Sequence, residues 1–204
     1  MSSGTKKKAI LFYPVFFSFL LFISCNMKFP DNHTQTENLQ FQFKPELLST
    51  SPLSTSEGLS FYIPRDWETL PLEKENLLKS TIETAEDTPA LIFLKAYQSI
   101  NLSTLIITKV NSLKENFSFL SLEYYSQLQS QFSSEDIHQA EFSVNSLPMK
   151  QFIIQTDSHI IIILYVGGKQ NYQLKFIVPK IEYEQEIGKI ESSIGTITNT
   201  GEKR

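Results

Sequence analysis

The sequence predicts an α+β fold in which a mostly antiparallel β-sheet carries helices on both faces. One observation is a row of four strand-like runs in the C-terminal third, joined by short turns of the kind that closes antiparallel pairs. Another is the run 160–166, IIIILYV, which is apolar at every position and predicts a central strand covered on both faces. Three segments with helical character interrupt the strand-like runs, an arrangement typical of layered α+β domains.

The first 24 residues have the composition of a leader peptide. Lys6, Lys7 and Lys8 precede an apolar run over 9–23. As a helix this run would span about 22 Å, whereas the hydrocarbon core of a bilayer is about 30 Å thick. Basic residues ahead of a short apolar stretch that ends in small residues are typical of a secretory signal. The sequence therefore predicts a signal peptide over residues 1–24.

The chain's single cysteine follows this run directly. The stretch Phe22-Ile23-Ser24-Cys25 resembles the lipobox of bacterial lipoproteins, with Phe22 where leucine is usual. The resemblance implies cleavage between Ser24 and Cys25, a diacylglycerol thioether on Cys25 and usually an N-acyl chain such as palmitate. Two or more acyl chains hold a protein stably at a membrane. An ordinary cleaved signal peptide and an uncleaved anchor helix are the alternatives.

Charge narrows the classes of partner. The 204 residues include 18 basic and 22 acidic ones, for a net charge of −4. Loss of residues 1–24 removes three lysines and no acid, which leaves 15 basic and 22 acidic residues and a net charge of −7. An acidic domain lacks the electrostatic footprint of a nucleic-acid binder. We therefore expect no nucleic-acid partner, and membrane contact through the N-terminus alone.

Residues 25–57 predict a polar, flexible tether, because Asn, Gln, Ser, Thr and Pro dominate and no helical period is present. A flexible chain of this length reaches about 30 Å. Residues 39–43 alternate with period two, so pairing as an edge strand stays open there. The folded domain is predicted over residues 58–197, followed by a solvated tail over 198–204.

The predicted domain begins with a strand over 58–64 that places Leu59, Phe61 and Ile63 on one face. Pro64 ends it, since proline cannot donate to a central ladder. We expect Trp67 to fold back over the end of the sheet.

A helix and a hairpin follow. The helix is predicted over 72–86, with Leu77, Leu78 and Ile82 inward. The runs 90–98 and 104–110 are rich in β-branched and aromatic residues and predict two strands joined by a hairpin connection. A second helix over 117–132 has its apolar positions at four-residue steps, namely Leu120, Tyr124, Leu128 and Phe132.

The C-terminal third predicts a meander of strands and a closing helix. The strands are expected over 138–144, 149–156, 159–166 and 172–178. Pro179 is expected to open the helix, because proline is favoured at a first helical position. Glu182, Glu184 and Glu186 would complement its N-terminal dipole. The buried stripe of this helix is predicted to be Tyr183, Ile187, Ile190 and Ile194.

This order of elements is similar to the Mog1/PsbP-like family, which includes small bacterial lipoproteins of the DcrB and LpqN type. The likeness is carried by residues 58–67 (GLSFYIPRDW), the turn at 144–148 and the closing helix at 187–194. It covers roughly residues 58–197. The resemblance implies an antiparallel sheet with helices on both faces, and a binding or assembly role with no shared catalytic residues.

The patterns that would indicate an enzyme are missing from the sequence. The letters of a catalytic triad at 157–159 are consecutive, and a triad needs side chains from separate segments. The Gly-Gly-Lys at 167–169 lacks the spacing and context of a phosphate loop. His33, His138 and His159 show no ligand spacing. We therefore predict no catalytic residue, no metal site and no cofactor.

The sequence thus predicts a lipoprotein of the bacterial cell envelope, anchored at the inner or the outer membrane, that acts as a non-catalytic binding or assembly factor for an unknown envelope protein. The chain has sixteen Phe, eight Tyr and one Trp. Most should pack in the core, but a groove near Trp67 is a candidate partner-binding site, with Tyr62 as its second candidate residue. The alternative function is carriage of a small apolar ligand between helix and sheet.

Overall fold

The structure is a computed structural model that describes residues 41, 43–56, 58–85, 90–111, 117–133 and 136–199. For residues 117–121 and 123 the account is limited to the backbone. The predicted leader, Ser24, Cys25 and the tether up to residue 40 lie outside the described residues. Within the described ranges, no helix has both the length and the apolar character needed to cross a bilayer.

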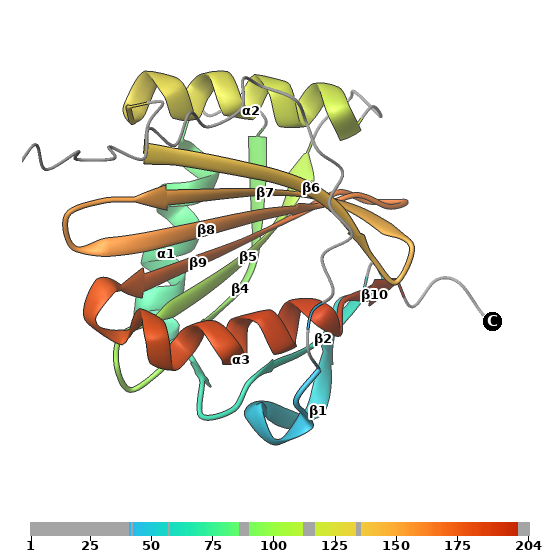
Figure 1. Cartoon of the computed structure of the whole chain (residues 1–204), viewed down its shortest axis with the longest axis vertical. Coiled ribbons are helices and arrows are strands. Elements are labelled where there is room, and N and C mark those ends of the chain that lie inside the picture. Colours follow the sequence, from blue (N-terminus) through green and yellow to red (C-terminus); the bar gives the residue numbers. More distant parts are fainter. Residues whose placement is uncertain are drawn as a thin grey trace, which may run out of the picture. The chain divides into compact units, whose positions relative to one another are not determined.

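Two antiparallel sheets form the framework (Figure 1). The larger has seven strands in the order β3-β4-β5-β9-β8-β7-β6. Their bounds are β3 Glu68–Thr69, β4 Ala90–Gln98, β5 Thr104–Asn111, β6 Ile137–Val144, β7 Leu147–Gln155, β8 His159–Val166 and β9 Tyr172–Pro179. The smaller sheet has the order β1-β2-β10, with β1 Leu48–Ser54, β2 Leu59–Pro64 and β10 Thr198–Asn199.

Helices cover both faces of the large sheet, which confirms the predicted fold class (Figure 1). The helices are α1 Leu72–Thr84, α2 Phe117–Gln131 and α3 Tyr183–Gly195, with short 3-10 turns η1 Pro45–Leu47 and η3 Lys180–Glu182. On one face, α3 and the small sheet enclose the main core. On the other face, α1 packs over β4 and β5, and α2 packs over β7 and β8.

Strand β8 confirms the prediction of a doubly covered central strand. It lies between β7 and β9 in the sheet. Ile162 and Leu164 point into the main core under α3, whereas Ile163 and Tyr165 belong to the cluster under α2. Because successive side chains alternate between faces, only a run that is apolar throughout can satisfy both covers.

Trp67 folds back over the end of the sheet, as expected. It is 6% exposed and packs edge-on against Phe176, with ring centroids 6.2 Å apart. Its indole N–H donates to Oε2 of Glu186 at 3.0 Å. Glu186 is 1% exposed, and its Oε1 lies 3.1 Å from Nζ of Lys189. Glu186 lies in the first turn of α3, where it was expected to complement the helix dipole, and it also forms a buried polar bridge from α3 to Trp67.

The predicted domain boundaries are also corrected. Strand β1, within the predicted tether, pairs antiparallel with β2, and β10, within the predicted tail, pairs with the other edge of β2. The polar composition of β1 and its Pro52 concealed it, because an edge strand needs only one apolar face and tolerates proline. Phe41 and Phe43 lie in no strand, and residues 39, 40 and 42 of the alternating stretch 39–43 lie outside the described residues.

Phe41 and Leu47 pack against α3 beside two of its glycines, and at Gly195 the approach is close enough that a side chain would crowd Phe41. A Cβ on Gly195 would lie 3.0 Å from Cβ of Phe41, and a Cβ on Gly188 would lie 3.8 Å from Cδ1 of Leu47. The Phe41 ring packs on Phe142 of β6, with centroids 5.2 Å apart. This part of the predicted tether therefore belongs to the folded domain.

Two details of the helices differ from expectation. Leu77 of α1 is 70% exposed, while Leu78 and Ile82 pack inward as predicted. The last helix begins at Tyr183, because Pro179 ends β9 and a 3-10 turn intervenes. The apolar stripes predicted for the helices are otherwise confirmed where they are described. Ile190 and Ile194 of α3 are buried, and so are Tyr124 and Leu128 of α2. The side chain of Leu120 lies outside the described residues.

Replacing the indole donor should destabilise the domain. We expect Trp67→Phe to lower the free energy of unfolding by about 1–3 kcal/mol, because a buried carboxylate oxygen loses its donor. The double variant Trp67→Phe/Glu186→Met should lose less than the single variant, since an unpaired buried acceptor costs more than an apolar pair. Urea denaturation followed by circular dichroism measures both. Equal stability of wild type and Trp67→Phe would contradict the assignment.

Candidate functional site

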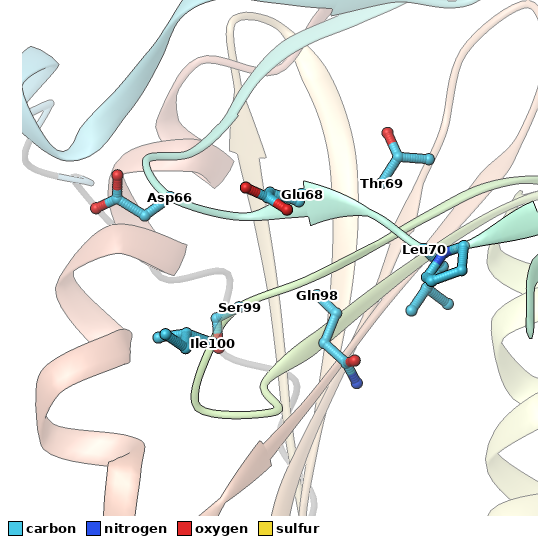
Figure 2. Close-up of a pocket in the computed structure, with 8 residues that line it drawn as sticks. Asp66, Glu68, Thr69, Leu70, Gln98, Ser99 and Ile100 are labelled. Atoms are coloured by element: carbon cyan, nitrogen blue, oxygen red, sulfur yellow. The ribbon is translucent and has the colours of Figure 1, made fainter.

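A cleft opens beside β3, an edge strand of the large sheet (Figure 2). Its volume is about 430 Å³, within the range of ligand-binding clefts. One wall is the segment that leaves β2, and the other is the start of the β4–β5 hairpin. We name it the β3 cleft, and its lining residues are Asp66, Glu68, Thr69, Leu70, Pro71, Gln98, Ser99 and Ile100.

The first wall of the β3 cleft is shaped by the turn after Pro64. Asp66 adopts a left-handed conformation with φ of 66°, which aspartate tolerates better than most residues. The N–H of Trp67 donates to the Pro64 carbonyl at 3.3 Å, and the indole enters the core. With Trp67 pointing inward, Asp66 and Glu68 on either side of it are exposed. Buried Trp67 thereby fixes the position of both carboxylates.

The second wall is the tight connection between β4 and β5. The N–H of Ser99 donates to the Ser103 carbonyl at 2.8 Å, and the N–H of Ser103 donates to Oγ of Ser99 at 3.1 Å. Leu102 has a φ of 66°, which is uncommon for a residue with a large side chain. The β4–β5 connection is also joined to η3, because Nδ2 of Asn101 donates to Oε2 of Glu182 at 2.8 Å.

The chemistry of the β3 cleft suits binding. Its eight lining residues include two carboxylates, Asp66 and Glu68, and no basic side chain. Figure 2 shows both acids on the β3 wall, with Gln98, Ser99 and Ile100 on the hairpin wall. Ser99 has neither histidine nor lysine among these neighbours to act as a base. The cleft offers an acidic wall beside an exposed aliphatic side chain.

Neither predicted partner-binding residue lines the β3 cleft. Trp67 stands behind it in the core, and Tyr62 is half-buried on β2. The backbone of Tyr62 ties β2 to the end of α3: its N–H donates to Oγ1 of Thr196 at 3.0 Å, and its carbonyl accepts from Oγ of Ser193 at 2.6 Å. Direct contact of either ring with a partner stays a prediction, as do cleavage at Ser24 and lipidation of Cys25.

Histidines and acids do not gather into a metal site among the described residues, where no group of three or more His, Cys, Asp or Glu side chains is placed to hold an ion. At the Asp157-Ser158-His159 turn, Oγ of Ser158 lies 2.8 Å from Nδ1 of His159. This is a contact between sequence neighbours at the start of β8, and the Thr156 hydroxyl accepts from the N–H of His159 at 3.0 Å. The arrangement is that of a hairpin turn.

A second hollow runs between α3 and the sheet, with a volume of about 540 Å³. We name it the α3 groove. Isoleucines from α3, β7 and β8 form its walls, and Phe41 and Lys44 of the segment before η1 lie at its margin. Burial raises the pKa of Tyr183 at the rim above its ordinary value of 10.0, and the carboxylates of Glu191 and Glu184 raise it further.

The sequence did not single out the aliphatic side chains at this end of the molecule. Ile100 and Leu102 lie in the β4–β5 connection, and Ile181 lies in η3. They are 91%, 66% and 85% exposed. The composition of the hairpin connection could have indicated these exposed side chains. Such a connection ordinarily uses Gly, Asn or Asp, and here two aliphatic residues flank Asn101.

No protein-family model matches the sequence, and no curated protein matches it. Among solved structures, the fold is similar to the cyanobacterial PsbP protein (CyanoP) of Synechocystis, with 8% identity, a TM-score of 0.48, and coverage of 73% of this chain and 91% of that chain. It is also similar to a Bacteroides thetaiotaomicron protein, with 14% identity, a TM-score of 0.39 and coverage of 72% of this chain. This chain spans about half, 47%, of the Bacteroides chain.

The raised pKa of Tyr183 predicts a loss of stability at high pH. The folded chain holds the phenol proton at pH values where the unfolded chain has released it, so stability falls as pH rises from about 10 through the folded-state pKa. We expect Glu191→Gln to move the pKa of Tyr183 back toward 10.0, because one carboxylate is removed. Phenolate absorbance of wild type minus Tyr183→Phe measures this pKa. Tyr97, whose pKa is raised by burial and by Glu75, is the internal control and should not move.

Proposed function

We propose that this chain is a lipid-anchored protein of the bacterial cell envelope whose α+β domain binds a protein partner at the β3 cleft without catalysing a reaction. The β3 cleft carries the proposal. It presents two exposed carboxylates and exposed Ile100 on walls that are held by the buried Trp67–Glu186 hydrogen bond and by the sheet. Sites built on such rigid supports bind without much loss of conformational entropy.

The non-catalytic part of the proposal rests on the side chains at the β3 cleft. Asp66 and Glu68 are solvent-exposed, and no histidine or lysine is among the residues that line the cleft beside them. Ser99 is engaged in the hairpin, where its Oγ accepts from the N–H of Ser103. We further propose that the domain is of the Mog1/PsbP-like type, because its strands and helices follow the same order along the chain. Membership of that type would agree with a binding or assembly role.

The anchor is proposed at Cys25, after cleavage at the Ser24–Cys25 bond. Because the segment from Phe41 packs on α3 and β1 pairs with β2, the predicted tether shortens to residues 25–40 at most. The choice between the inner and the outer membrane is left to fractionation of cells.

Metabolic labelling tests the anchor. Wild-type protein expressed in bacteria should incorporate labelled palmitate and partition into the detergent phase, whereas Cys25→Ala should do neither. An unlabelled wild type that keeps its intact N-terminus would overturn the lipoprotein assignment. A Cys25→Ala protein that still enters the detergent phase would point to an uncleaved anchor helix.

Site-specific photo-crosslinking in cells tests the β3 cleft. A photoreactive amino acid at Thr69, in the cleft wall, should give a discrete higher-mass adduct. The same group at Ser130, exposed on α2 beyond the cleft, is the matched control and should give none. The adduct should weaken in the Glu68→Lys background, which reverses one of the two wall charges. Equal adducts from both positions, or none from either, would contradict a binding role for the cleft.

The α3 groove favours a second function, carriage of a small apolar ligand between helix and sheet. Its volume suits a ligand of moderate size, and isoleucines dominate its walls. Native mass spectrometry of protein purified from cells should then show an added mass that is reduced in Ile153→Glu. A spectrum of bare protein would count against carriage and leave the binding role at the β3 cleft untouched.

A further inference from the structure

We propose that three exposed aliphatic side chains at and beside the β3 cleft form the recognition surface for a partner segment that carries both aliphatic and basic residues. We name this surface the aliphatic tip, and it consists of Ile100, Leu102 and Ile181. The inference rests on the proposed binding function and deepens it, because it states the chemistry of the partner.

Two members of the aliphatic tip, Ile100 and Ile181, are more exposed than Leu72 at 72% and Leu77 at 70%, and Leu102 is comparable with those two leucines. The three side chains are 91%, 66% and 85% exposed, whereas the main core below buries its aliphatic residues almost completely. Single exposed aliphatics are normal on a protein surface, but a group on adjoining segments is typical of an interaction site. Two members belong to the β4–β5 connection and the third to η3, 79 to 81 positions further along the chain.

A hydrogen bond holds these two segments together. Nδ2 of Asn101, between Ile100 and Leu102, donates at 2.8 Å to Oε2 of Glu182, which follows Ile181. Within the connection, the N–H of Leu102 donates to the Ser99 carbonyl at 3.1 Å. The three aliphatic side chains are therefore presented on a fixed scaffold, which lowers the entropic cost of binding.

The backbone conformation of Leu102 indicates that this side chain serves a function and not the stability of the fold. Its φ of 66° lies in the left-handed region, where Gly and Asn are accommodated and a larger side chain is strained. Glycine would relieve this strain, and burial of the leucine side chain does not compensate for it, since that side chain is 66% exposed. An exposed leucine at a strained position gains its use from a contact made by a partner.

Charge selects the class of partner. Asp66 and Glu68 line the β3 cleft together with Ile100, and Glu182 follows Ile181 and accepts a hydrogen bond from Asn101 between Ile100 and Leu102. Nearby Arg65 is directed elsewhere, with its Nε donating to the Leu48 carbonyl of β1 at 3.4 Å, and Lys180 is the remaining basic neighbour in sequence. Three carboxylates near these aliphatic side chains complement a segment with both aliphatic and basic residues. They oppose insertion into an anionic bilayer.

Defined peptides test the inference on the full chain in non-ionic detergent. Three labelled peptides of equal length alternate Ile with Lys, Ile with Glu, and Ser with Lys. Fluorescence anisotropy should show binding of the Ile/Lys peptide, at least tenfold weaker binding of the other two, and weakening with added salt. The tip variant Ile100→Ser/Leu102→Ser/Ile181→Ser should bind the Ile/Lys peptide at least tenfold more weakly. The control variant Leu72→Ser/Leu77→Ser/Leu122→Ser changes three other exposed leucines and should bind as wild type does.

A single substitution separates loss of binding from loss of folding. Leu102→Gly should raise the melting temperature, because the backbone strain is relieved, while it weakens binding of the Ile/Lys peptide several-fold. Unchanged or tighter binding by Leu102→Gly, or equal binding by the tip and control variants, would overturn the inference. If the crosslink from Thr69 in cells persists in the tip variant, the binding function stands and only the partner chemistry fails.

A bilayer contact is the competing outcome. A polarity-sensitive dye attached at Ile100→Cys, in anchored protein reconstituted into phosphatidylglycerol vesicles, should report a water-exposed environment. A blue shift of its emission would assign the tip to the membrane and overturn the protein-partner assignment.

Discussion

The hydrogen bond from the Trp67 indole to the buried carboxylate of Glu186 is the constraint on which this end of the molecule depends. It joins the chain leaving β2 to the first turn of α3, two segments 119 residues apart. A carboxylate 1% exposed is costly to bury without donors, so the indole N–H and Lys189 hold it from two sides. With Trp67 committed to the core, its neighbours Asp66 and Glu68 are exposed and form the acidic wall of the β3 cleft.

Helix α3 then organises the remaining features along its length. The segment that begins at Phe41 contacts Gly195 at the C-terminal end of the helix and reaches Gly188 through Leu47. Ile181 and Glu182 precede its N-terminal end. Thirteen helical residues span about 20 Å. Phe41 therefore lies near one end of α3, and Ile181 of the aliphatic tip lies near the other.

The β3 cleft and the tip combine rigidity with local features that do not favour stability. Strand pairing and the Asn101–Glu182 hydrogen bond fix the walls. In contrast, Leu102 has a left-handed backbone conformation, and the three aliphatic side chains of the tip are exposed to water. A strained backbone and exposed aliphatic side chains on a rigid support agree with the binding surface proposed above.

The sequence by itself determined the alternation of strands and helices, the doubly covered strand β8 and the inward fold of Trp67, because side-chain periodicity records which faces of an element are apolar. Only the tertiary structure decided that polar β1 joins the sheet, that Glu186 is buried, and that Leu77 stays exposed. It also brought Ile181 beside the β4–β5 connection through the Asn101–Glu182 contact. These features depend on pairing between distant segments, and no local pattern of residues specifies which distant segment will supply the partner strand, the donor or the cover.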